Sequence, residues 1–67
     1  MKEIADNLLK LRMGKQLSQG YVAKIVGISV RTYQRYETGE RLPELGTAIK
    51  LADFYHISLD RLVGRSF

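Results

Sequence analysis

The fold is decided by residues 17–43, which read LSQGYVAKIVGISVRTYQRYETGERLP. Ser18 and Ser29 are each placed to cap the free backbone amides at the start of a helix. Between the two helices, Gly27 can take the left-handed conformation that a side chain resists, and this lets the chain reverse direction within one or two residues. The stretch therefore predicts two short helices joined by a sharp turn, together covering about residues 18–37.

Apolar residues at helical spacing show which side of each helix faces inward. Before the quoted stretch, Ile4, Leu8 and Leu11 recur at i, i+4 and i+7 with polar residues between them, and this pattern predicts an amphipathic helix. Gly14 marks the end of this first helix. The second helix has an inward stripe that comprises Val22, Ala23 and Val26.

The chain after the quoted stretch is also expected to be helical. Pro43 is well suited to the first turn of a fourth helix over about residues 44–55. The inward residues of this fourth helix are Leu45, Ala48, Leu51, Ala52 and Tyr55. Ser58 caps a short fifth helix whose inward residues are Leu59, Leu62 and Val63. Because no segment shows convincing strand alternation, the predicted fold class is all-α, with five helices.

Length and composition limit what this chain can be. Its 67 residues give room for one domain, residues 1–67, with one modest core, and no cysteine is present to form a disulfide or a thiolate metal site. Charged residues near the start, such as Lys2 and Asp6, interrupt any signal-peptide region. No apolar run approaches the roughly 20 residues of a membrane span. We therefore expect a soluble, cytoplasmic protein.

The net charge of +4 lies in the first part of the chain. Residues 1–41 carry eight Lys/Arg and four Asp/Glu, whereas residues 42–67 carry three of each. A localised positive face suits a polyanion, because neutralising phosphates releases condensed counterions. A generally basic soluble domain, whose copies are kept apart by their charge, accounts for the composition equally well. Charge alone therefore leaves both interpretations open.

Residues 17–43 resemble the helix-turn-helix segment of the phage repressor and Cro family, also called the XRE family. The matching residues are Leu17, Ser18, Gln19, Val22, Ala23, Gly27, Ile28, Ser29, Tyr36, Glu37, Gly39 and Pro43. The resemblance covers roughly residues 4–63 and implies a five-helix, lambda-repressor-like DNA-binding domain. Tyr33 and Tyr55 depart from the family pattern, which usually has aliphatic residues there. The resemblance therefore does not indicate how the side chains at these two positions pack.

The third helix, over roughly residues 30–37, is the predicted reading element. A helix-turn-helix places this helix in the major groove, about 12 Å wide, while the second helix crosses the phosphates. Tyr33 and Tyr36 lie on one side of the helix and the polar residues on the other. Arg can donate two bonds to guanine, Gln can bond adenine, and an apolar side chain can touch a thymine methyl. The predicted base-reading residues are Val30, Arg31, Gln34 and Arg35, with an ordinary solvated helix face as the alternative.

Predicted phosphate contacts flank the same helix. Gln19, on the first turn of the second helix, can bond a phosphate beside the positive end of the helix dipole. The resemblance implies the same role for Thr32, Thr38 and Arg41, and the charge of Arg41 adds to counterion release whatever the DNA sequence. Routine surface hydrogen bonding is the alternative for each.

The resemblance also implies an internal ion pair between Arg12 and Glu37. This pair would brace the first helix against the end of the third. If the pair is buried, deleting one partner strands a charge at a cost of about 3–5 kcal/mol, whereas an exposed pair is worth under about 1 kcal/mol. Both possibilities are open from the sequence.

Catalysis is not expected. His56 is the single histidine and sits at the predicted end of the fourth helix, and no glycine-rich phosphate loop is present. The serines have no suggested base partner and serve better as helix caps. We therefore expect no catalytic residue, no metal, no cofactor and no small-molecule ligand.

The predicted function is sequence-specific binding of double-stranded DNA by a homodimer that regulates transcription, most simply as a repressor. Dimerisation is expected because one short helix reads only a few base pairs, and two copies about 34 Å apart extend the site. The proposed dimer contact comprises Leu59, Leu62, Val63 and Phe67, although Phe67 can instead cover its own core. The alternative function is a protein-interaction module of the same fold, antitoxin-like or an anti-repressor partner, without specific DNA reading.

Overall fold

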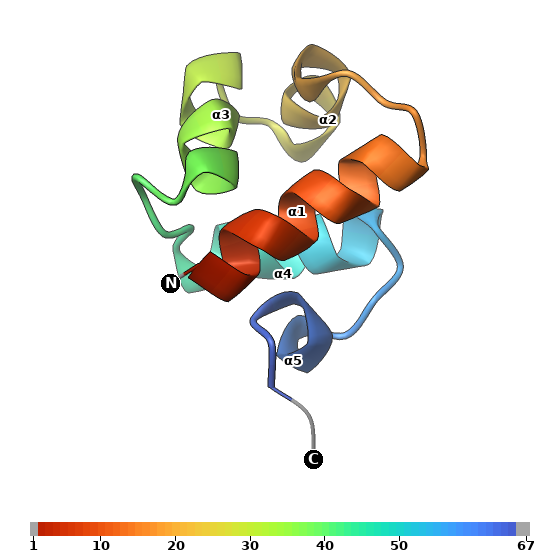
Figure 1. Ribbon diagram of the computed structural model, residues 1–67. Coiled ribbons are helices and arrows are strands. Elements are labelled where there is room, and N and C mark those ends of the chain that lie inside the picture. The colour runs from red at the N-terminus through yellow and green to blue at the C-terminus, as the bar shows by residue number, and fades with distance from the viewer. Residues whose placement is uncertain (1, 66–67) are drawn as a thin grey trace.

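The computed structural model describes residues 2–65, and within this range the chain forms helices, turns and loops but no strand. The helices are α1 (Lys2–Gly14), α2 (Gln19–Val26), α3 (Val30–Thr38), α4 (Leu45–Phe54) and α5 (Leu59–Leu62). In Figure 1, α1 crosses the centre of the molecule with α2 and α3 above it and α5 below it. The predicted all-α fold with five helices is confirmed.

The turn between α2 and α3 forms as predicted. The Ser18 side chain accepts a hydrogen bond from the backbone N–H of Tyr21 at 3.0 Å, and Ser29 accepts one from Thr32 at 3.1 Å. Gly27 ends α2 with φ 86°, in the left-handed region. Each cap satisfies one of the amides that the first turn of a helix leaves without a partner, and the glycine takes the reversal without strain. Local sequence signals therefore set the limits of both helices.

The start of α4 differs from the prediction. Glu44 has an extended backbone and precedes the helix, so Pro43 lies outside the first turn rather than in it. Leu45, predicted to face inward, is 67% exposed. Helical side chains tilt toward the N-terminus, so a residue in the first turn points past the end of the helix instead of onto the core. The inward side of α4 is formed by the buried residues Ala48, Leu51 and Ala52, followed by Tyr55.

The core draws one fully buried residue from each helix. These residues are Leu8, Val22, Tyr33, Leu51 and Leu62, in chain order. Even the four-residue α5 is therefore fixed to the body of the molecule. The Asn7 side chain strengthens this attachment, because its amide donates to the carbonyl oxygens of Arg61 and Leu62 at 3.1 and 3.0 Å. These carbonyls lie at the end of α5, where the Arg61 carbonyl also accepts a hydrogen bond from the backbone N–H of Gly64 at 3.2 Å.

The burial of α5 corrects the predicted dimer contact. Leu62 is fully buried in the core of its own chain, so it cannot also contact a second copy. Leu59 and Val63 are half-buried and pack against the same core. A short helix of this kind can cover the core only with the side that carries these apolar residues. The fourth residue of the predicted contact, Phe67, lies outside the described residues.

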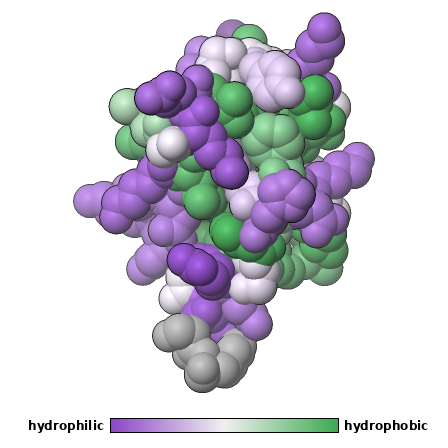
Figure 2. Space-filling model, turned by 90° about the vertical axis from the view of Figure 1, so that its right-hand side faces the viewer, coloured by the Kyte–Doolittle hydropathy of each residue, from purple (hydrophilic) through white to green (hydrophobic). Residues whose placement is uncertain are grey.

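Some apolar side chains remain at the surface. On the face shown in Figure 2, hydrophobic residues lie between hydrophilic ones. The large hydrophobic residues with exposed side chains are Leu9, Met13, Tyr21, Ile25, Val30, Leu42, Leu45 and Ile49. They come from several elements, of which α3 contributes only Val30. Among the described residues, no helix combines the length and the apolar character needed to cross a membrane.

The two tyrosines that depart from the family pattern pair with each other. The hydroxyl groups of Tyr33 in α3 and Tyr55 after α4 are 2.8 Å apart and buried. Replacing an aliphatic residue by tyrosine brings a polar group into the core, where it costs free energy unless it finds a partner. Here each hydroxyl is the partner of the other, so the two departures compensate.

Removing the Tyr33 hydroxyl alone should cost more than removing both hydroxyls, whereas in Tyr55→Phe the Tyr33 hydroxyl keeps its hydrogen bond to Glu37. Tyr33→Phe leaves the Tyr55 hydroxyl without its partner, and we expect a loss of about 1–3 kcal/mol in the free energy of unfolding. The double variant Tyr33→Phe/Tyr55→Phe should recover part of this loss, because neither polar group is then buried. Urea denaturation of the two single variants and the double variant gives the coupling energy. Strictly additive losses would show that the hydroxyl pair contributes nothing.

Candidate nucleic-acid interface

The two sides of α3 are used in different ways. Tyr33 and Tyr36 are 0% and 4% exposed and attach the helix to the core. Arg31 and Gln34 are exposed on the other side, and Arg35 is half-exposed. The structure therefore agrees with the predicted division of the helix into a packed side and a side open to solvent.

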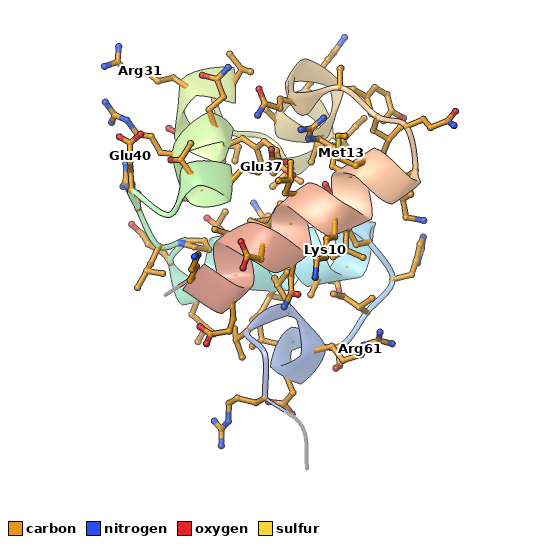
Figure 3. The ribbon with its side chains drawn as sticks, in the orientation of Figure 1. Lys10, Met13, Arg31, Glu37, Glu40 and Arg61 are labelled. Atoms are coloured by element: carbon orange, nitrogen blue, oxygen red, sulfur yellow. The ribbon has the colours of Figure 1, made fainter. Side chains whose placement is uncertain are left out.

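The open side of α3 contributes to a shallow groove of about 360 Å³. The residues that line it are Arg31, Gln34, Arg35, Thr38 and Glu40. Three of the four predicted base-reading residues are thus brought together, while Val30, the fourth, is exposed at the first position of the helix. Figure 3 shows Arg31 and Glu40 on the same outer side of α3, away from the body of the molecule. We call this groove with Val30 the reading surface.

Glu40 is the residue of this surface that the sequence did not reveal. It follows Gly39, whose left-handed backbone at φ 83° ends α3 and turns the chain back along the helix. The hydroxyl group of Thr38 lies 3.2 Å from the Glu40 carboxylate and holds it at the groove. A carboxylate beside two arginines lowers the attraction of the groove for any phosphate. The sequence Thr38-Gly39-Glu40 was the available signal for this residue. Only the direction of the turn at Gly39 shows that Glu40 lies at the groove.

The predicted phosphate residues around α3 differ in what they can donate. The Thr32 hydroxyl accepts a hydrogen bond from Ser29 at 2.9 Å, so its own proton remains available. The Thr38 hydroxyl faces the Arg35 carbonyl at 3.1 Å and the Glu40 carboxylate, and its single proton is used within the protein. Arg41 is exposed in the loop after α3. Thr32 and Arg41 are therefore the better placed of the three.

Gln19 makes contacts within the protein that the sequence did not indicate. Its amide nitrogen donates to Glu37 Oε1 at 3.0 Å. Its amide oxygen accepts a hydrogen bond from Gln34 Nε2 at 3.1 Å. A residue predicted to bind phosphate thus contacts a predicted base-reading residue, across the angle between α2 and α3.

Arg12 and Glu37 form a buried, two-bond ion pair. Arg12 Nε and Nη2 donate to the two carboxylate oxygens of Glu37 at 2.7 and 3.0 Å, and the side chains are 13% and 3% exposed. Arg12 Nη1 also donates to the carbonyl oxygen of Leu17 at 2.9 Å. The pair implied by the family resemblance is confirmed, and it is the buried alternative. It connects α1, the loop before α2, and α3.

The surroundings of Glu37 keep it charged. Burial by itself would raise the pKa of its carboxyl group, but hydrogen bonds from Arg12, Tyr33 and Gln19 outweigh this effect, so the pKa lies below its ordinary value of 4.5. The hydrogen bond to Glu37 raises the pKa of Arg12 in turn. Burial raises the pKa of Tyr33 and Tyr55, and both phenols are neutral. The network therefore contains one full positive and one full negative charge.

Comparison with known proteins identifies the family. A family model described as helix-turn-helix matches residues 8–62. The chain belongs to this family, the XRE-type helix-turn-helix proteins. It is a family of transcriptional regulators and not of enzymes, in agreement with the expectation that this chain has no catalytic role.

Particular relatives support the same assignment. The chain is 38% identical over 63 residues to the cryptic phage CTXphi transcriptional repressor RstR of Vibrio cholerae, covering 94% of this chain and 56% of the repressor. It is 42% identical over 60 residues to the HTH-type transcriptional regulator AnsR of Bacillus subtilis, covering 90% and 52%. The crystal structure of a transcriptional regulator from Listeria innocua superposes with a TM-score of 0.89 at 33% identity, covering 96% and 60%. The chain thus spans about half the length of these curated relatives.

The ion pair gives a pH-dependent prediction. Arg12→Met leaves Glu37 buried without its cation, and we expect a loss of about 3–5 kcal/mol in the free energy of unfolding at pH 7. The folded-state pKa of Glu37 is lowered, so its stabilisation is present above the unfolded-state value of 4.5 and disappears as the pH falls through the folded-state pKa. The difference between the variant and the original protein should therefore shrink in acid. Urea denaturation at pH 7 and pH 3 tests this, and an unchanged difference at pH 3 would contradict it.

Proposed function

We propose that this chain binds double-stranded DNA in a sequence-specific manner and regulates transcription, with α3 reading the major groove. The supporting observation is the structure of α3 itself. Its tyrosines are buried, while Arg31, Gln34 and Arg35 line one groove on the opposite, solvent-facing side. A helix fits the major groove only if it projects from the domain with base-reading side chains on its outer face.

The proposed contacts divide into two kinds. Arg31 and Arg35 can each donate two bonds to a guanine, and Gln34 can bond an adenine, while Val30 can touch a thymine methyl. Arg41 and Thr32 contact phosphates on either side of α3 and add affinity without sequence preference. The base contacts set which site is bound, and the phosphate contacts hold α3 in register.

We further propose that two copies act together as a cytoplasmic repressor. One α3 covers only a few base pairs, so two copies on half-sites about 34 Å apart give the length of site that specificity needs. The relative RstR is named as a transcriptional repressor, which favours repression over activation. Because α5 uses Leu62 in its own core, the contact between copies must use other residues.

The alternative, a protein-interaction module of the same fold, has less support. A protein-binding surface is expected to have aromatic or aliphatic anchors near its centre. On the exposed side of α3, the large apolar residue is Val30 at the helix start, and the centre is occupied by arginine and glutamine. Selection from a pool of random duplexes distinguishes the two functions. A pool that shows no enrichment and no salt-dependent retention would exclude DNA reading.

Two arginines should behave differently in this experiment. Arg31→Ala should weaken preferred sites selectively, by the about 1–3 kcal/mol of one base contact. Arg41→Ala should weaken all sequences alike and reduce the salt slope of binding by roughly one unit. Fluorescence anisotropy on the selected site and on a scrambled duplex, over a salt series, measures both effects. Equal effects from the two variants would show that their roles are assigned wrongly.

Glu40 should act in the opposite direction. Glu40→Gln removes a negative charge from the groove that Arg31 and Arg35 line, so we expect binding to scrambled DNA to tighten and the salt slope to become steeper. Discrimination between the selected site and the scrambled duplex should fall. Glu44→Gln, an exposed charge at the start of α4, is the matched control. If both substitutions tighten binding equally, the effect comes from net charge and not from the position of Glu40.

A further inference from the structure

A continuous chain of hydrogen bonds runs from the core to the reading surface. Arg12 donates to Glu37, Gln19 donates to Glu37, and Gln34 donates to Gln19, with donor to acceptor distances between 2.7 and 3.1 Å. Its inner end is the buried ion pair, and its outer end is an exposed residue of the groove. Structural and DNA-facing residues are therefore directly connected.

The direction of this chain is fixed by chemistry. An ionised carboxylate has no proton to donate, so the atom of Gln19 that faces Glu37 must be the amide nitrogen. This turns the amide oxygen of Gln19 toward Gln34. Gln34 must then donate to it through its own amide nitrogen. The single charge on Glu37 thus determines the orientation of two successive amide groups, the second of which lies at the surface.

We propose that Glu37, acting through Gln19, orients the Gln34 amide for adenine. This inference rests on the proposed function. In the fixed orientation Gln34 retains a carbonyl oxygen and a second N–H for the DNA. The Gln34 carbonyl oxygen can accept a hydrogen bond from the N6 amino group of adenine, and the free N–H can donate to adenine N7. Guanine offers two acceptors, O6 and N7, so one of them would face the Gln34 carbonyl oxygen. Gln19 is then a positioning residue that sets base preference.

The test compares two glutamine variants in the selection from random duplexes. Gln34→Ala first identifies the base pair that Gln34 reads, as the one position at which the adenine preference disappears. Gln19→Leu keeps the side-chain volume but can neither accept from Gln34 nor donate to Glu37. We expect it to reduce the preference for adenine over guanine at that same base pair by about tenfold, while other positions keep their preferences. Gln19→Ala repeats the test without added apolar surface.

The controls separate this effect from folding and from general affinity. Thermal unfolding shows whether the variants remain folded, which we expect because Gln19 is only half-buried and Arg12 still neutralises Glu37. Lys24→Ala, an exposed residue of the same helix, should leave every base preference unchanged. If Gln19→Leu and Gln19→Ala weaken all sequences by the same factor, Gln19 is a phosphate ligand and the proposed orientation is wrong. If the original protein itself enriches no sequence, the proposed function fails and this inference with it.

Discussion

The buried ion pair of Arg12 and Glu37 is the interaction on which the rest of the structure depends. The two side chains join α1 to α3 by two hydrogen bonds, and a third bond from Arg12 holds the loop before α2. In a chain of 67 residues without cysteine, the apolar core is small, and one such contact fixes the relative positions of three helices. A buried pair of charges contributes little net stability compared with apolar residues, but its geometry is specific. Its contribution here is to the angle at which α3 is presented.

The tyrosines of α3 complement the ion pair. Tyr33 is fully buried and its hydroxyl meets that of Tyr55 beyond the end of α4, so α3 is tied to α4 by a hydrogen bond as well as by packing. Tyr33 also helps to keep the pKa of Glu37 low. Two tyrosines that look unfavourable when considered singly are thus part of one network with the Arg12–Glu37 ion pair. Such a network specifies a single arrangement because each buried polar group has its partner.

In the proposed function, the position of α3 and the recognition of bases are coupled. The residues that set the position of α3 extend, through Gln19, to a side chain of the reading surface. The surface also contains an acid, Glu40, among its arginines. A purely basic groove would bind any duplex, because phosphate attraction carries no sequence information. In the proposed function, the oriented Gln34 amide and the Glu40 carboxylate favour hydrogen bonding to bases over general attraction to the phosphate backbone.

Apart from the first turn of α4, the sequence by itself determined the five helices and the two sides of α3. The caps at Ser18 and Ser29, the glycine turn and the helical spacing all act within a few residues, so they could be interpreted without knowledge of the rest of the fold. Only the tertiary structure decided what depends on the distance between helices. It showed that the ion pair is buried, that Gln19 meets Gln34, and that α5 covers its own core. These contacts join residues from different helices, and their geometry follows from packing angles that no local pattern encodes.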